Sequence, residues 1–94
     1  MTETQLKNTI QKAQRADELL SDPLIQEFII AVRGELLHEF ESSKLHDEKA
    51  MRNAWHKSQV FNQFLDKFTA QIKEGKNAEF TLLQRVKNKV RHII

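Results

Sequence analysis

The sequence has no cysteine, one proline and two glycines among its 94 residues. The absence of cysteine excludes disulfide bonds, thiolate zinc sites and cysteine nucleophiles, so packing or association must supply the stability. Few residues break helices, and no useful stretch of β-branched residues alternates with polar ones, so strands are not indicated. We therefore expect an all-α protein, and a chain of this length suffices for one domain with one core.

Long hydrophobic runs are also missing. The longest unbroken apolar run, from Phe28 to Val32, is far shorter than the ~20 residues that a membrane-spanning helix needs. The N-terminus has no basic start followed by an apolar stretch, so no secretory signal is visible. Hydrophobic residues make up 39% of the chain and charged residues 30%, as in ordinary globular proteins. We expect a soluble protein with no membrane partner. An intracellular location is compatible with this sequence.

The sequence offers no recognisable catalytic motif. Metal sites in helical bundles require two Glu-x-x-His pairs and two further glutamates, and this chain has one pair, Glu35-x-x-His38. No serine has an elbow motif or a histidine partner in a recognisable context, and Gly75-Lys76-Asn77 has too few glycines for a phosphate-binding loop. The other histidines lack ligand spacing: His46, His56 and His92. We therefore expect a non-enzymatic protein with no catalytic residue, no cofactor and no metal.

Capping residues predict where the first helix begins. Thr2-x-x-Gln5 has the spacing at which hydroxyl and amide side chains satisfy the free backbone donors, so a helix is expected over about 3–20. Its apolar positions form a thin stripe of Leu6, Ile10, Ala13, Ala16 and Leu20. The stability of such a helix in isolation is marginal, so the helix must pack against another element.

The clearest boundary signal is Asp22-Pro23. Asp22 can cap a second helix, and Pro23 fits its first turn, where no backbone donor is needed. This helix is expected to reach about Glu41 with a broad apolar face: Leu24, Ile25, Phe28, Ile29, Val32, Leu36, Leu37 and Phe40. Gly34 lies inside it and costs about 1 kcal/mol relative to alanine, which indicates either a close helix contact or simple tolerance.

A third, long helix is expected after a short connection over 42–46. Asp47 can cap it, and it is predicted to end near Glu74, with Gly75 as the left-handed residue beyond its last turn. Its apolar seam follows three-four spacing: Met51, Ala54, Ser58, Phe61, Leu65, Phe68 and Ile72. Trp55 and Phe64 lie on opposite flanks of this seam, so the apolar band is wider than one neighbouring helix needs. At least two packing partners are therefore implied.

The second and third helices should form an antiparallel hairpin, because their connection is short. The fold class is then a helical hairpin or three-helix bundle with a long third helix. In one interpretation Trp55, Phe61, Phe64 and Phe68 are the core of that bundle. In the other, a second copy covers the part of the third helix that the shorter second helix leaves open, and a dimer is favoured. The predicted interface residues are Trp55, Phe61, Phe64, Leu65, Phe68 and Ile72.

Charge is uneven along the chain. From Lys73 onward six basic and two acidic residues give +4, so the sequence suggests a helical domain over 1–75 and a basic amphipathic segment over 76–94. The segment is expected to start near Thr81, with Leu82, Leu83, Val86, Val90 and Ile93 on one face. Its basic residues are the candidates for a nucleic-acid-binding accessory role: Arg85, Lys87, Lys89 and Arg91. A solvated or protein-binding role remains the alternative.

The stretch from Ala16 to Glu79 resembles a family of small, mostly uncharacterised proteins that tailed bacteriophages encode, often among head and packaging genes. The matching features are Leu19-Leu20-Ser21-Asp22-Pro23 before an apolar helix, Asp47-x-x-x-x-Arg52-x-x-Trp55 opening a long helix, and Gly75 closing it. The resemblance implies a virion-assembly or virion-associated protein, found in the host cytoplasm during assembly and in some cases in the virion. A phage structural protein is then the expected partner. An inhibitor that docks on a host protein is a further alternative with the same aromatic surface.

Overall fold

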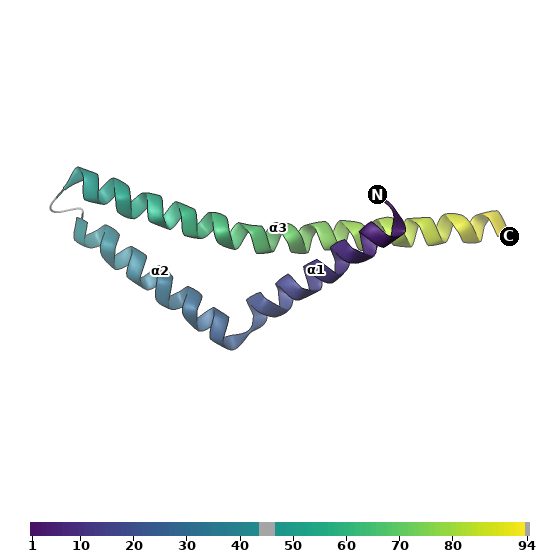
Figure 1. Ribbon diagram of the computed structural model, residues 1–94, viewed down its shortest axis with the longest axis horizontal. Coiled ribbons are helices and arrows are strands. Elements are labelled where there is room, and N and C mark those ends of the chain that lie inside the picture. Colours follow the sequence, from purple (N-terminus) through teal and green to yellow (C-terminus); the bar gives the residue numbers. More distant parts are fainter. Residues whose placement is uncertain (44–46, 94) are drawn as a thin grey trace. The chain divides into compact units, whose positions relative to one another are not determined.

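The computed structural model describes residues 1–43 and 47–93. Within these ranges the chain forms three helices and no strand: α1 (Glu3–Ser21), α2 (Pro23–Ser43) and α3 (Glu48–Ile93) (Figure 1). The predicted all-α class with a long third helix is therefore confirmed. Of the predicted connection over 42–46, Ser42 and Ser43 belong to α2, and residues 44–46 lie outside the described residues.

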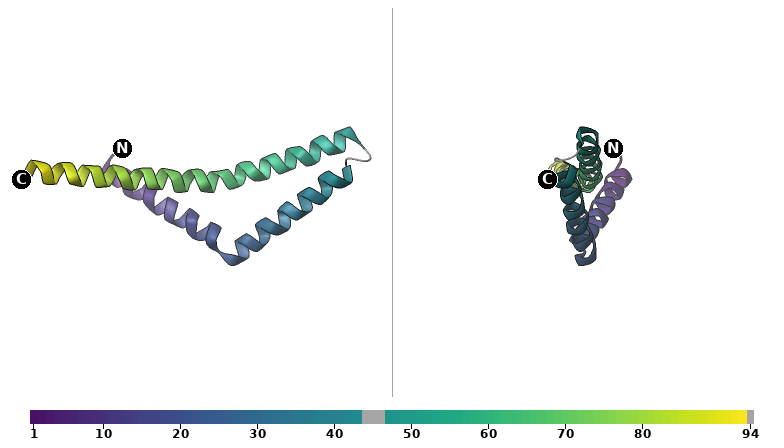
Figure 2. Two further views of the ribbon diagram at one scale, coloured as in Figure 1. Left: turned by 180° about the vertical axis from the view of Figure 1, so that it is seen from behind. Right: turned by 90° about the vertical axis from the view of Figure 1, so that its left-hand side faces the viewer.

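The helices form two compact units. The α1 unit comprises Met1–Leu19 and Phe68–Ile94, and the hairpin unit comprises Leu20–Lys67. In the α1 unit, α1 lies beside the C-terminal part of α3, and in the hairpin unit α2 lies beside its N-terminal part (Figures 1 and 2). Helix α3 thus contributes residues to both units.

The predicted N-terminal capping box is present on α1. The Thr2 backbone N–H donates to Gln5 Oε1 over 2.8 Å, and the Gln5 N–H donates to Thr2 Oγ1 over 3.1 Å. The predicted cap of α3 is also confirmed, because Asp47 Oδ1 accepts a hydrogen bond of 3.0 Å from the Lys49 N–H. These bonds satisfy backbone donors that the first turn of a helix leaves without intrahelical partners.

Asp22 separates α1 from α2 as predicted. Its Oδ1 accepts hydrogen bonds from the Leu24 N–H at 2.8 Å and from the Ile25 N–H at 3.2 Å. Pro23 occupies the first helical position, where its missing donor leaves no bond unmade. The chain therefore ends one helix and starts the next within two residues.

The predicted end of the third helix near Glu74 is wrong. Helix α3 continues to Ile93, and Gly75 does not have the positive φ of a residue that terminates a helix. Thr81 does not open a new helix either, because its hydroxyl donates to the Asn77 carbonyl over 3.0 Å inside α3. The division into 1–75 and 76–94 stays a prediction, although no helix boundary marks it.

Gly75 instead allows two helices of the α1 unit to approach closely. A Cβ placed on Gly75 would overlap the Cβ of Ala13 on α1 and would lie 3.7 Å from the Thr9 carbonyl oxygen. Gly34 is the opposite case, because a Cβ there would meet nothing within 4 Å. Of the two explanations for Gly34, a close contact with the described part of the chain is therefore excluded.

Small side chains dominate the buried positions of both units. The described hydrophobic residues in the buried class are Leu6, Ala13, Ala16, Ala54, Leu65 and Ala78. Alanine brings helix backbones close together but removes little apolar surface from water, since hydrophobic stabilisation scales with the area buried. The interpretation in which Trp55 and Phe64 form a bundle core is wrong, because Trp55 is 54% exposed and Phe64 is 58% exposed.

No helix among the described residues is long and apolar enough to span a bilayer.

Candidate protein interface

A cross-helix ion pair joins α2 and α3 on one side of the hairpin. Lys57 Nζ on α3 lies 2.8 Å from Glu39 Oε1 on α2, with both side chains about half exposed to solvent. Near the end of α2, the Ser43 hydroxyl donates to the Phe40 carbonyl over 2.7 Å. Both views in Figure 2 agree with the predicted hairpin in placing α2 alongside α3.

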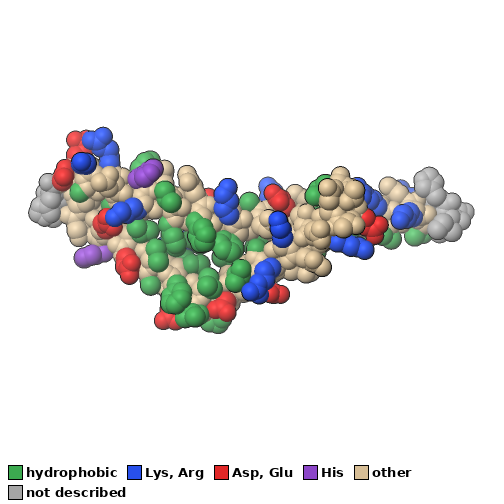
Figure 3. All heavy atoms as spheres, in the orientation of Figure 1, with side chains coloured by type: hydrophobic (Ala, Val, Ile, Leu, Met, Phe, Trp, Pro, Cys, Tyr) green, Lys and Arg blue, Asp and Glu red, His purple; other side chains and the backbone are tan. Residues whose placement is uncertain are grey.

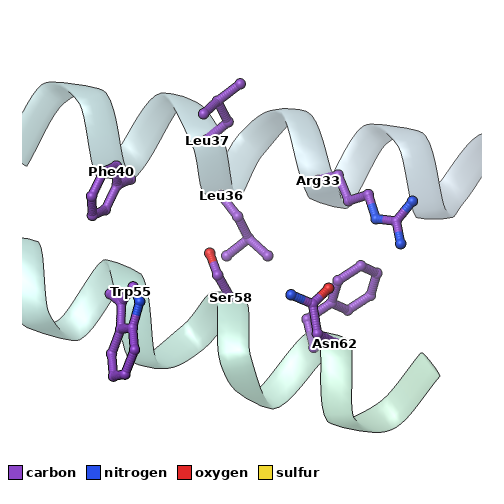
Figure 4. A pocket seen from close by; sticks show the side chains of 8 residues that line it. Arg33, Leu36, Leu37, Phe40, Trp55, Ser58 and Asn62 are labelled. Carbon is purple, nitrogen blue, oxygen red and sulfur yellow. The ribbon is translucent and has the colours of Figure 1, made fainter. Parts of the chain in front are cut away.

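An open groove of about 330 Å³ lies between α2 and α3 in the hairpin unit. In Figure 4, Leu36 points from α2 toward Ser58 on α3, whereas Leu37 lies on the opposite side of α2. Its lining is mostly apolar, with a guanidinium and an amide at one end: Arg33, Leu36, Leu37, Phe40, Trp55, Ser58, Phe61 and Asn62. Mostly apolar walls of this kind can accept apolar side chains.

The predicted interface residues differ in how accessible they are. Trp55 and Phe64 are more than half exposed, and their positions on either flank of α3 agree with the predicted seam. Phe61 is half-buried and lines the groove. Leu65 is only 9% exposed, so it packs inside the chain rather than facing a partner.

Phe68 and Ile72 complete the predicted set, and both are half-buried. They belong to the α1 unit, whereas Trp55, Phe61, Phe64 and Leu65 belong to the hairpin unit. The predicted seam with three-four spacing, together with Trp55 and Phe64 on its flanks, thus runs through two compact units. Among the predicted interface residues, Trp55 and Phe64 carry most of the accessible aromatic surface of the hairpin unit.

Helix α2 exposes apolar side chains that the sequence placed on its broad apolar face, and it also exposes Ile30, which the sequence did not single out. Figure 3 shows hydrophobic side chains gathered over its N-terminal half. Leu24, Phe28 and Leu37 are each more than half exposed, and Ile30 is 71% exposed. The width of the apolar pattern in the sequence could have predicted this exposure, since one packing partner covers only about a third of the circumference of a helix.

The basic residues predicted as nucleic-acid contacts lie on the last turns of α3, and all four are exposed. Helical spacing places them as two i,i+4 pairs, Arg85 with Lys89 and Lys87 with Arg91. These pairs border the apolar strip of Leu83, Val86 and Val90 on both sides. Arg85 also donates from Nη2 to the Met1 carbonyl oxygen over 2.6 Å, which ties the N-terminus to α3 within the α1 unit.

The Glu35-x-x-His38 pair is exposed on α2. The described residues contain no cluster of three or more metal-ligating side chains. His56 lines a second open groove of the hairpin unit together with Glu39 and Lys57. Glu39 and Lys57 form an ion pair with each other. His46 lies outside the described residues, and the side chain of His92 does as well.

Comparisons with protein families, with curated proteins and with solved structures find no match to this chain. Its function must therefore be argued from the two units themselves.

Proposed function

We propose that this chain is a non-enzymatic helical interaction protein that self-associates through the aromatic surface of its hairpin unit. The observation that supports this most is the exposure of Trp55 and Phe64, at 54% and 58%. Monomeric proteins seldom leave large aromatic side chains uncovered beside an apolar groove, and such surfaces commonly mark protein interfaces. Trp55 lines that groove together with Phe61.

The energetic gain from covering this surface is moderate. Complete burial of an exposed large apolar side chain contributes roughly 1.5–3 kcal/mol, and tryptophan is enriched among the residues that dominate binding energy. Association must also offset lost translational and rotational freedom, estimated at about 4–15 kcal/mol. The aromatic side chains are already partly covered, so the gain from burying them is similar in size to this cost. The expected dimer is therefore weak, and a dilution series can follow its dissociation.

Size-exclusion chromatography with light scattering over a concentration series tests the proposal. The wild-type mass is expected to rise toward that of a dimer at high micromolar concentration, while quenching of Trp55 fluorescence by acrylamide falls. Trp55→Ala and Phe64→Ala should shift the chain toward monomer. Leu83→Ala is the matched control, because Leu83 is 51% exposed but lies in the α1 unit. A monomeric wild type across the series contradicts self-association.

The resemblance to phage proteins supports a setting for this interaction, namely particle assembly in an infected bacterium with a structural protein as a second partner. Mass spectrometry of purified particles tests this setting. Recovery of peptides from this chain with the particles supports a virion-associated role. Recovery on a host enzyme in pull-downs, with none on particles, favours the inhibitor alternative instead.

Nucleic-acid binding is the second candidate function, and one observation favours it. Helix α3 exposes three basic side chains near its C-terminal end: Lys87, Lys89 and Arg91. Because this part of the chain is already helical, these side chains can contact phosphates without the entropy cost of folding a flexible segment. A deletion after Gly75 is unsuitable as a test, because it removes the surface on which α1 packs. Replacing these three residues by glutamine leaves that packing intact. Loss of salt-dependent DNA binding in this variant supports the candidate, and the absence of such binding in the wild type rejects it.

A further inference from the structure

The groove between α2 and α3 ends in an arginine that has no partner among the described residues. Of the residues that line this groove, Arg33 alone carries a charge. The structure gives Arg33 no ion pair and no hydrogen bond with any described residue. No acidic side chain lies three or four positions from it on α2, where helical neighbours meet, because those positions are all apolar: Ile29, Ile30, Leu36 and Leu37. The positive charge at this end of the groove is therefore available to a ligand.

A second polar group lies at the same end of the groove. Figure 4 shows the Asn62 amide of α3 and the Arg33 guanidinium of α2 at one end, with Phe40 and Trp55 at the other. The guanidinium offers a planar fork of donors that matches a carboxylate, and the amide can donate as well. This end of the groove is therefore suited to one anionic head group.

The dimensions of the groove limit the rest of the ligand. Its walls run from Arg33 to Phe40 on α2 and from Trp55 to Asn62 on α3, which is about 10 Å along each helix. An extended chain gains about 1.2 Å per bond, so about eight to ten carbons span this length. A docked helix would meet only about two turns of each wall, so a groove this short favours an acyl chain.

We propose that this groove binds a medium-chain carboxylate, with its head group on Arg33 and Asn62 and its acyl chain along the apolar walls. The ligand class follows from charge complementarity, since one cationic end and apolar walls suit a single negative charge on an apolar tail. The inference goes beyond the proposed self-association and does not require it. Tail contacts are expected with Leu37 and Trp55, which are 58% and 54% exposed.

Titration of the dilute full-length chain with octanoate, below its critical micelle concentration, tests the site. Trp55 is the only tryptophan, so its fluorescence reports directly on the groove. Saturable binding of one octanoate per chain is expected. From hexanoate to decanoate, each added methylene should tighten binding by up to about fourfold, because more apolar surface is buried. Affinity should level off beyond about ten carbons, where the walls end. A steady increase to longer chains indicates unspecific adsorption and overturns the proposal.

Arg33→Gln tests the head-group contact. It should weaken octanoate binding by about three- to tenfold, since a charge-assisted hydrogen bond is lost, and leave binding of 1-octanol unchanged. The matched control is Arg52→Gln, because Arg52 is exposed on α3 of the same unit and does not line the groove. Equal losses in the two variants overturn the assigned contact. Wild-type binding of octyltrimethylammonium as tight as that of octanoate overturns it too.

Ser58→Leu tests the place where the tail binds. Leucine at this half-buried groove position fills the open space and favours a helix, so the variant should keep its circular dichroism and bind both octanoate and 1-octanol about tenfold more weakly. A folded variant with undiminished binding overturns the groove as the site. Light scattering without ligand keeps the proposed function separate: a chain that dimerises but binds no octanoate overturns this inference alone. A chain that binds octanoate but never dimerises supports it and overturns self-association.

Discussion

Gly75 of α3 lies directly against Ala13 of α1, so closely that the site has no room for a Cβ on residue 75. Both residues are buried, and so are Ala16 on α1 and Ala78 on α3. The α1 unit is therefore built on small residues at the point where its two helices meet. Of the two glycines, Gly75 is therefore the one at which an added methyl group disturbs the packing.

Gly75→Ala is expected to destabilise the α1 unit by about 1–3 kcal/mol, because overpacking forces the two backbones apart. The better helix propensity of alanine offsets this by up to about 1 kcal/mol. Urea unfolding followed by circular dichroism measures the difference. Gly34→Ala is the matched control and should be stabilising at concentrations where the chain is monomeric, so destabilisation by both variants contradicts the assigned packing.

Asp22→Ala is expected to lower stability by about 0.5–2 kcal/mol, since it removes the acceptor for the first donors of α2. Those donors are the backbone N–H groups of Leu24 and Ile25. Thermal unfolding followed by circular dichroism gives the change. Asp22→Asn retains an acceptor oxygen and should recover most of the loss. Equal destabilisation by alanine and asparagine means that the capping bonds are not the cause.

The Glu39–Lys57 ion pair is expected to contribute less than about 1 kcal/mol, because both side chains are about half exposed to solvent. A double-mutant cycle with Glu39→Gln and Lys57→Met measures the coupling free energy. The coupling should shrink further between low and high salt, since screening weakens exposed ion pairs. A coupling that exceeds 1 kcal/mol and is independent of salt contradicts this assignment.

Leu65→Ala is expected to lower the free energy of unfolding by about 2–5 kcal/mol, because it leaves a cavity at a buried position. Its neighbour Phe64 is 58% exposed, so Phe64→Ala should change the stability of the monomer by much less. Chemical denaturation of both variants at low protein concentration compares them directly. Similar losses would mean that Phe64 is packed as tightly as Leu65.

The starts of α1, α2 and α3 were predicted well because their signals are local. Thr2, Asp22 and Asp47 accept hydrogen bonds from donors within three residues, so the chemistry that starts each helix is written in adjacent positions. The opposite flanks of Trp55 and Phe64 follow equally from helical spacing alone. These features need no knowledge of what the helix packs against.

The interface set was predicted less well, because periodicity identifies an apolar side without saying what covers it. Leu65 and Phe64 are adjacent in sequence and both apolar, yet one is buried and the other exposed. Ile30 gave no signal of its own within the apolar run of α2. Its exposure depends on which side of α2 turns toward α3, and that is decided by packing across the hairpin.

By itself, the sequence determined the helical class, the caps and the absence of cysteine chemistry, since each depends on composition or on residues a few positions apart. Only the tertiary structure decided the roles of the two glycines. A glycine has no side chain to indicate its purpose, so Gly75 could equally end a helix or admit a neighbour. The presence of Ala13, distant in sequence but adjacent in space, makes it a contact and lets α3 continue.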